Sequence, residues 1–460
     1  MSGARALHPS ILRAYDIRGI VGQTLSPDDA EAVGRAFATV VRKGGGRSVC
    51  VGYDGRLHSP ALEAALVDGL ASAGAHAIRV GLGPTPMLYF AVKKFEADAG
   101  VMVSGSHNPP DHNGFKFQMA SGPFHGDDIA GLGRIVAGGA FETGRGSRED
   151  RPVLDAYVDR VALDFDGGRP LRVAWDAGNG SAGEAMRMLC ARLPGTHILL
   201  NEEIDGTFPS HHPDPTVADN LRQLIGAVTA QGCELGIAFD GDGDRIGVVD
   251  GAGRILWGDQ ILMLLARDVL ARHPGATVIA DVKASQFLFD EIARLGGVPL
   301  MWSSGHSLIK AKMAETGALL AGEMSGHVFI ADRYFGYDDA IYAAVRLLDF
   351  LSRAGETLAE IRDRLPSAVA TPELRFRCDG ARKFAVVEEI RGRLREEGEE
   401  MSEVDGVRVR TGDGWWLLRA SNTEEALVAR CEAADGDGLD RLKASLRRQL
   451  DESGVDAPDM

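Results

Sequence analysis

The chain has 460 residues, of which 45% are hydrophobic and 25% are charged, and it carries a net charge of −16. This ordinary globular composition excludes a disordered chain, a collagen-like repeat and a coiled-coil rod, and the length predicts roughly three domains, with two to four allowed. The acidic charge argues against a nucleic acid or an anionic membrane surface as the partner. An anionic ligand would therefore need a local basic pocket.

The cysteines and the first residues bear on the compartment. The cysteines are five in number, scattered, and never form a C-x-x-C pair, which argues against a disulfide framework or a zinc knuckle. The first residues lack the apolar core of a signal peptide, and no uncharged apolar run of about 18 residues occurs. We therefore expect a cytoplasmic protein whose buried thiols are reduced, namely Cys50, Cys190, Cys233, Cys378 and Cys431.

The first three quarters of the chain repeat one pattern of strands and helices. Over residues 48–104, the apolar segments RSVCVGY, HAIRVGL and AGVMVSG alternate with helical patterns, which indicates buried parallel strands joined by helices. The same pattern returns over residues 171–240 and again over 258–330. We therefore predict three similar α/β modules in succession.

The pattern changes after Pro366. The strands ELRFRC, GVRVRT, WWLLRAS and ALVARCEA, together with two helices, predict an α+β layer. Glycine, proline and charge punctuation place the domains at residues 1–150, 151–253, 254–367 and 368–460. In each α/β module an apolar strand runs into a polar, glycine-containing loop, and chemistry in such sheets lies beyond the carboxyl ends of the strands.

A cluster of three carboxylates follows the apolar strand LGIAF. Asp240, Asp242 and Asp244 alternate with glycines, so a curling loop can turn three hard oxygen ligands toward one Mg²⁺ or Ca²⁺ ion. The EF-hand interpretation fails because Arg245 stands where that loop needs glycine and Gly251 where it needs glutamate. An aspartyl-nucleophile phosphatase fits better but lacks the Thr or Val expected next. A solvated acidic turn remains the alternative to a metal site.

Two further segments carry candidate phosphate chemistry. Ser106 lies beside His107 and near Lys116, so it is a candidate nucleophile, although Ser-His before Asn-Pro is also ordinary turn chemistry. The strand WWLLRA carries a guanidinium near its end, and two hydroxyls and an amide follow it. Together these groups suit a phosphate or a helix cap. These residues are Arg419, Ser421, Asn422 and Thr423.

The remaining polar segments suit a sugar. Glu323, Ser325 and His327 offer the groups that bind sugar hydroxyls, although a buried hydrogen-bonded pair would look the same. Two more segments are candidates for the same site and can equally be caps or surface loops; they contain Ser304, Gly305, His306 and Lys310, and Tyr15, Arg18 and Gly19. Together the segments outline a polar, metal-bearing and locally basic site for a small phosphorylated polyol.

Taken together, SHNP with NGxK, DGDGDR, GEMSGH and RxSNT occur in an order and at separations that resemble the α-D-phosphohexomutase family. The resemblance spans the chain, from AYDIRG at 14–19 through PTP at 84–86, GNG at 178–180 and GHSLIK at 305–310. It is nearest to the bacterial members that act on both mannose and glucose phosphates. It implies four domains around a central cleft: three related α/β mixed-sheet modules and a C-terminal α+β domain.

The resemblance also implies a reaction and residue roles. Ser106 would bear the transferable phosphoryl group and, with Asp240, Asp242 and Asp244, hold Mg²⁺. A phosphoryl group would move reversibly between hexose 1-phosphate and hexose 6-phosphate through a hexose 1,6-bisphosphate, with Lys116, His107, His306 and His327 as candidate proton acceptors. The implied catalytic residues are Ser106, His107, Lys116, Arg18, Arg245 and His306. The implied substrate-binding residues are Tyr15, Lys283, Ser304, Gly305, Glu323, Ser325, His327, Arg419, Ser421, Asn422 and Thr423, with Asn108 also lining the cleft.

Two departures from the family pattern and two rival functions stay open. Glu425 stands where many relatives have proline, and the serine loop reads SGSHNP in place of TASHNP, which leaves Ser104 without a role. A phosphatase would use the same metal and serine with water as the acceptor, and a silent sugar-phosphate binding protein is the second rival. We expect small phosphosugars as partners, no nucleic acid or membrane, and a monomer or a dimer.

Overall fold

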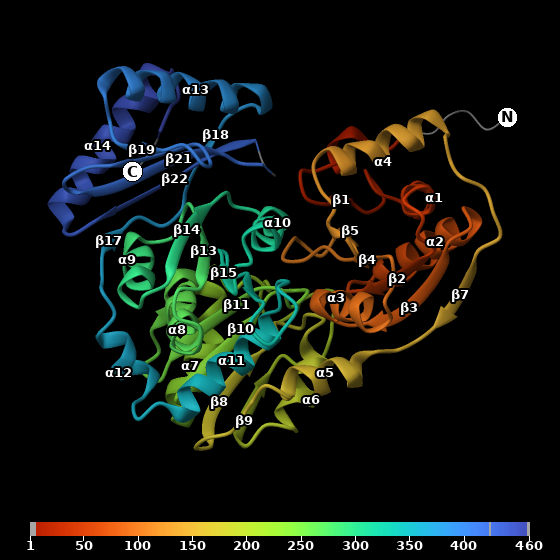
Figure 1. The fold of residues 1–460 in the computed structure, drawn as a ribbon, viewed down its shortest axis with the longest axis horizontal. Helices are drawn as coiled ribbons and strands as arrows, with labels where there is room; N and C mark the ends of the chain where they lie inside the picture. The colour runs from red at the N-terminus through yellow and green to blue at the C-terminus, as the bar shows by residue number, and fades with distance from the viewer. Residues whose placement is uncertain (1–5, 423–424, 458–460) are drawn as a thin grey trace.

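A computed structural model describes residues 6–422 and 425–457. In those residues four sheets follow one another along the chain. Figure 1 shows the first module in red and orange, the second and third in yellow to cyan, and the C-terminal module in blue above the third. No helix in the described ranges is long and apolar enough to cross a membrane. All five cysteines are buried and free, as the sequence predicts.

The first sheet has the strand order β1-β5-β4-β2-β3-β7, with β6 paired to β5. Strand β4 is buried along its whole length, as expected for a strand covered on both faces. Ser26 caps helix α1, which begins with proline and two acidic residues and ends with two basic ones, so both ends suit the helix dipole. The module contains η1 (Pro9–Ile11), β1 (Ile17–Ile20), α1 (Pro27–Lys43), β2 (Ser48–Tyr53), α2 (Ser59–Ser72), β3 (His76–Leu82), α3 (Thr85–Lys94), β4 (Ala99–Val103), β5 (His112–Met119), β6 (Gly122–Pro123), α4 (Asp127–Gly138) and β7 (Ser147–Asp150).

The second and third sheets have the orders β12-β11-β10-β8-β9 and β14-β13-β15-β16. The second module contains α5 (Leu154–Ala162), β8 (Leu171–Asp176), α6 (Gly183–Cys190), β9 (Gly195–Leu200), η2 (Ala218–Leu221), α7 (Arg222–Gln231), β10 (Leu235–Phe239), β11 (Ile246–Asp250) and β12 (Ile255–Leu256). The third contains α8 (Gly258–Arg272), β13 (Thr277–Asp281), α9 (Gln286–Arg294), β14 (Val298–Trp302), α10 (His306–Thr316), β15 (Leu320–Gly322), β16 (Val328–Ile330), α11 (Ala340–Arg353) and α12 (Leu358–Asp363).

The three modules share one topology, which confirms that they are related. In each, parallel strands are followed by one antiparallel strand, giving the equivalent orders β5-β4-β2-β3, β11-β10-β8-β9 and β16-β15-β13-β14. A hairpin loop joins the last parallel strand to the antiparallel one. These equivalent loops, at 104–111, 240–245 and 323–327, are the polar loops that the sequence singles out.

The fourth sheet is antiparallel, with the order β17-β22-β21-β20-β19 and β18 paired to β22. It is the α+β domain that the sequence predicts. Its apolar core, which includes Trp416, is its own, and a small cluster of Val282, Trp415 and Leu417 joins it to the third module. The elements are β17 (Val369–Ala370), β18 (Leu374–Arg377), α13 (Gly380–Glu397), β19 (Met401–Ser402), β20 (Val407–Arg410), β21 (Gly414–Ala420), β22 (Ala426–Ala433) and α14 (Gly436–Glu452).

Candidate active site

The equivalent loops of the first two modules meet at Ser106. This serine is 2% exposed and has a left-handed φ of 50°, a conformation that a non-glycine residue adopts only where its surroundings impose it. Its Oγ donates a hydrogen bond to Oδ2 of Asp240 over 3.1 Å. Gly241 lies against the same residue, where an added Cβ would stand 2.3 Å from the carbonyl oxygen of Ser106. The serine loop, residues 104–111, and the acidic loop, residues 240–245, therefore pack in direct contact, and even one added methyl group would clash.

A buried arginine that the sequence analysis missed holds the serine loop. Arg56 is 1% exposed and pairs through Nε with Asp54 over 3.2 Å. Asp54 in turn accepts a hydrogen bond from the backbone N–H of Gly105 at 3.0 Å. The available signal was the sequence YDGR, which begins at the last residue of β2, at the carboxyl end of the sheet, where functional loops gather.

The acidic loop has the features of a cation site. Asp240, Asp242 and Asp244 are fully buried, and their ligand oxygens lie within 4.8 Å of one another. Burial, together with the neighbouring carboxylates of Asp244 and Asp242, raises the pKa of Asp240 well above its usual value. One oxygen each of Asp242 and Asp244, Oδ1 in both, is buried without a hydrogen-bond partner. Clustered hard oxygen ligands with unused lone pairs fit a divalent cation such as Mg²⁺.

Lys116 reaches the acidic loop from β5. Its Nζ donates to Oδ2 of Asp242 and to Oδ2 of Asp244, each over 2.6 Å. Burial alone would lower the pKa of this lysine, but the carboxylates outweigh burial and raise the pKa above its usual value. Lys116 is therefore held as an ammonium. Ser104, whose role the sequence left open, donates its Oγ proton to Oδ2 of Asp242 at 2.8 Å and accepts from the N–H of Ser106 at the same distance.

Within residues 6–422 and 425–457, two other groups of side chains lie close enough to bind a metal, but contacts between imidazoles and carboxylates explain their proximity. The first comprises His107, His212 and Asp214, in which Nδ1 of His107 lies 3.2 Å from Oδ2 of Asp214. Burial lowers the pKa of His107 to about 3, with the positive charge of Arg245 adding to the effect. The second comprises Asp244, His327 and Asp338. Each contains an imidazole beside a carboxylate, which needs no cation.

His327 joins the third loop to the second. Its Nε2 accepts a hydrogen bond from Nε of Arg245 over 3.1 Å. Its ring stacks on that of His306, with centroids 5.7 Å apart. Burial lowers the pKa of His306 well below its usual value, and Lys310 lowers it further. The structure thus brings His327 to the acidic loop and stacks His306 against His327.

Glu323 connects the third loop to the start of α10. Its Oε1 accepts from the backbone N–H of Gly305 over 2.7 Å. Gly305 has φ 138°, and an added Cβ would stand 2.6 Å from the hydroxyl oxygen of Tyr15, so this position requires glycine. Tyr15 donates to the carbonyl oxygen of Ser304 over 3.0 Å, and burial raises its pKa to about 12. Ser325 is half-buried on the same loop.

The C-terminal module reaches this group through the loop after β21. Nδ2 of Asn422 donates to Oη of Tyr15 over 2.5 Å, which joins the fourth module to the first. Nε of Arg419 and the N–H of Ser304 both donate to Oδ2 of Asp405, at 2.8 and 3.0 Å. Asp405 is a second residue that the sequence analysis missed. Thr423 lies outside the described residues.

The remaining predicted residues lie around the same centre. Ser421 is buried on the Asn422 loop. Nη1 of Arg18 donates to Oδ1 of Asn108 over 2.9 Å on the serine loop. Nζ of Lys283 lies 3.5 Å from Asp281 and 3.2 Å from Glu373. Burial would lower the pKa of this lysine, but the two carboxylates outweigh it and the pKa rises.

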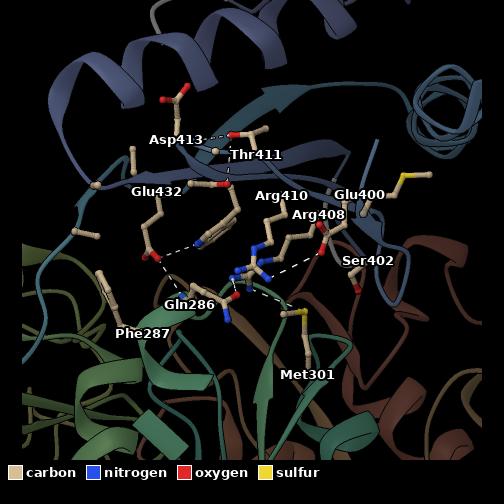
Figure 2. A pocket seen from close by; sticks show the side chains of 17 residues that line it. Gln286, Phe287, Met301, Glu400, Ser402, Arg408, Arg410, Thr411, Asp413 and Glu432 are labelled. Carbon is tan, nitrogen blue, oxygen red and sulfur yellow. Dashed lines mark hydrogen bonds and ion pairs between the residues drawn. The ribbon is translucent and has the colours of Figure 1, made fainter. Parts of the chain in front are cut away.

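A separate pocket of about 410 Å³ lies between the third and fourth modules and contains none of the predicted residues. Figure 2 shows Glu432, Gln286 and Arg408 meeting there. Oε1 of Glu432 accepts from Nε1 of Trp415 at 2.8 Å and from the N–H of Gln286 at 3.0 Å. Nη1 of Arg408 donates to the carbonyl oxygens of Val282 and Ala284. Because these polar groups already bind one another, we interpret the pocket as part of the interface between the third and fourth modules and not as a ligand site.

Comparison with known proteins covers the same four regions. Residues 9–141, 154–253 and 257–369 match the family models for phosphoglucomutase/phosphomannomutase alpha/beta/alpha domains I, II and III, and residues 373–449 match that for the C-terminal domain. A phosphomannomutase/phosphoglucomutase from Pseudomonas aeruginosa is 45% identical over 452 residues, covering 98% of this chain and 98% of that protein. A phosphoglucomutase from Neisseria gonorrhoeae is 44% identical over 437 residues, covering 94% of this chain and 95% of that protein.

The fold has a counterpart among solved structures. The crystal structure of a phosphoglucomutase/phosphomannomutase family protein from Burkholderia thailandensis matches with a TM-score of 0.94 at 44% sequence identity. The match covers 98% of this chain and 100% of that one. The similarity therefore includes all four modules and the loops between them.

Proposed function

The chain belongs to the phosphoglucomutase/phosphomannomutase family, and on that basis we propose that Ser106 carries the phosphoryl group that it exchanges with a hexose phosphate. Members of this family are isomerases that move a phosphoryl group between the 1- and 6-positions of a hexose. The observation that carries the proposal is the 3.1 Å hydrogen bond between Oγ of Ser106 and Asp240, at the edge of a buried acidic loop.

The family is metal-dependent, and we assign Mg²⁺ to Asp240, Asp242 and Asp244, with an oxygen of phosphorylated Ser106 completing the ligands. The support is the pair of unpartnered buried oxygens on Asp242 and Asp244. When bound, the cation would withdraw negative charge from the transferred phosphoryl group.

The side chains of the site supply positioning and charge. The P–O bond to Ser106 breaks as the bond to a sugar hydroxyl forms, and the hydroxyl proton passes to a nearby base. Lys116, held as an ammonium by two carboxylates, is suited to stabilising charge, as are Arg18 and Arg245. His107, His306 and His327 are the remaining candidates for accepting the proton.

The first transfer yields a hexose 1,6-bisphosphate, which turns over in the site and returns its other phosphoryl group to Ser106. Glu323, Ser325 and His327 would bind the sugar hydroxyls, because they lie on one loop beside the acidic loop. The phosphate that does not react would bind at the junction of the first, third and fourth modules, where Asn422 contacts Tyr15. Its ligands would be Tyr15, Lys283, Ser304, Gly305, Arg419, Ser421, Asn422 and Thr423.

A coupled assay tests the proposal. Formation of glucose 6-phosphate from glucose 1-phosphate is followed with Mg²⁺ and a trace of glucose 1,6-bisphosphate, and mannose 1-phosphate is assayed in parallel. Ser106→Ala should abolish turnover of both sugars. Ser121→Ala, at an exposed turn of the same module, should retain it. Full activity of Ser106→Ala would overturn the assignment, and release of inorganic phosphate at the rate of isomerisation would indicate a phosphatase instead.

The five free, buried cysteines also support a cytoplasmic location. Measuring the fraction of each thiol that is oxidised in cells tests this assignment. Reduced thiols are expected, and stable disulfides would contradict it.

A further inference from the structure

We propose that Asp338 is a positioning residue of this active site, which acts by holding His327 and His306 in the orientation that phosphoryl transfer needs. The inference rests on the proposed function. Asp338 lies in the loop between β16 and α11 and is fully buried. It pairs with Phe329 of β16 through a backbone bridge, so the position of its carboxylate is fixed by the sheet.

The carboxylate faces three groups that can carry positive charge. Its Oδ1 accepts a hydrogen bond from Nζ of Lys310 over 3.0 Å. Its Oδ2 lies 3.3 Å from Nδ1 of His327 and 3.6 Å from Nδ1 of His306. His306 and Lys310 lie one turn apart on α10, whereas His327 is the last residue of the third loop, residues 323–327. Asp338 therefore ties the start of α10 to the loop that meets Arg245.

The contacts of His327 fix which of its nitrogens carries the proton. A guanidinium can only donate, so Nε2 of His327, which receives the Nε–H of Arg245 over 3.1 Å, must offer a lone pair. The ring proton of the neutral imidazole is then on Nδ1, facing Asp338 and, at 3.6 Å, Asp244. An orienting carboxylate behind a histidine sets both its tautomer and its ring position. Asp338 thus keeps the Nε2 lone pair of His327 directed at Arg245.

The neighbouring residue provides a matched control. Asp339 is also buried, but its oxygens accept from the hydroxyls of Tyr157 and Tyr334 and from the N–H of Tyr342, at 2.9, 2.8 and 2.9 Å. Through Tyr342 it caps α11. It is the same residue type and equally buried, yet it touches neither histidine in these contacts.

The test compares Asp338→Asn with Asp339→Asn in the full chain with Mg²⁺. An amide has one acceptor oxygen and cannot serve Lys310 and both histidines, so we expect kcat of Asp338→Asn to fall about 10- to 100-fold, with KM for glucose 1-phosphate within about threefold. Asp339→Asn should keep kcat within about threefold. Phosphorylation of Ser106 by glucose 1,6-bisphosphate, measured in the wild-type chain, separates this test from that of the proposed function.

A ¹⁵N spectrum of the histidines gives a second readout, and its wild-type measurement needs no folded variant at position 338. The His327 signals, assigned by their loss in His327→Gln, should be those of the Nδ1–H tautomer in the wild-type chain and should change in Asp338→Asn. Wild-type kcat in a folded Asp338→Asn variant would overturn the proposal. So would an Nε2–H tautomer, or a metal on Nδ1, in the wild-type spectrum.

Discussion

Nη2 of Arg56 donates a hydrogen bond to the backbone carbonyl oxygen of Ser106 over 2.7 Å. The same guanidinium reaches the carbonyl oxygens of Asn108, Pro109 and His112, at 2.6, 2.5 and 3.0 Å. A planar cation with donors on several edges can hold four carbonyls at once, which an ammonium cannot. The left-handed backbone of Ser106 therefore depends on one buried side chain.

Arg56→Lys should lower kcat at least about tenfold, because the lysine cannot span the four carbonyls of the serine loop. Arg56→Met should also cost about 3–5 kcal/mol of stability, because it leaves Asp54 buried and unpaired. Steady-state kinetics and urea unfolding measure the two effects. Arg148→Lys is the control, because Arg148 forms an exposed pair with Asp68, which is worth about 1 kcal/mol or less. Wild-type kcat in Arg56→Lys would contradict the assigned role.

Gly241→Ala should inactivate the enzyme by separating the serine loop from the acidic loop. The new Cβ would stand 2.3 Å from the carbonyl oxygen of Ser106, which is backbone and cannot move aside. Gly226→Ala is the matched control, because Gly226 lies inside α7 with no atom within 4 Å of the added Cβ. There the change should stabilise the helix by up to about 1 kcal/mol. Kinetics and thermal unfolding of both variants check the contrast, and an active Gly241→Ala would show that the loops need not pack as described.

Mg²⁺ should raise the unfolding temperature, and Asp242→Asn should reduce that rise. A cation that binds only the folded state stabilises it by about 2.7 kcal/mol at a hundred times its Kd, and the three aspartates repel one another without it. Thermal unfolding with EDTA and with Mg²⁺ measures the effect. Asp68→Asn, at an exposed aspartate, should leave the rise intact. An equal rise in Asp242→Asn would place the cation elsewhere.

Asp339 should make the fold less stable as the pH rises. Burial raises its pKa to about 7 from an ordinary value of 3.8, so between these values the unfolded chain has released the proton that the folded chain keeps. The free energy of unfolding then falls by at most about 4 kcal/mol as the pH rises from about 4 to about 7. Above that range this contribution no longer changes. Asp339→Asn should remove this part of the pH dependence of the unfolding free energy, as measured by urea unfolding at several pH values. An unchanged slope in Asp339→Asn would show that the carboxyl titrates normally.

Much of what the sequence predicts correctly follows from one rule, that functional loops lie at the carboxyl ends of parallel strands. In each module a polar loop directly follows an apolar strand. Because the three modules repeat one topology, these loops are equivalent hairpins that converge, and they carry Ser106, Asp240 and His327. A local pattern suffices when the strand and its loop are adjacent in the chain. The same reasoning identifies the C-terminal module, whose short alternating strands differ visibly from the buried parallel ones.

Asp338 and Asp405 could not be found in this way. Asp338 lies outside the loop that holds His327, and Asp405 contacts Ser304 of another module. Contacts between segments that are separated in the sequence are not reported by periodicity. Ser104 is similar, because its partner Asp242 belongs to another module. Arg56 did have a local signal, the YDGR segment at the end of β2, which the sequence analysis did not use. A buried arginine or aspartate in a turn has the same local sequence as a solvated one.

The most direct measurement is the site of phosphorylation. The chain is mixed with Mg²⁺ and glucose 1,6-bisphosphate, digested and examined by mass spectrometry, and a second sample is chased with glucose 1-phosphate. We predict a single phosphoryl group on Ser106. When that group is isotopically labelled, the label should pass to the sugar during the chase, while an unlabelled phosphoryl group from glucose 1-phosphate takes its place on Ser106. A phosphoryl group on Ser104 or on an aspartate, or none that is transferred to the sugar, would contradict the account.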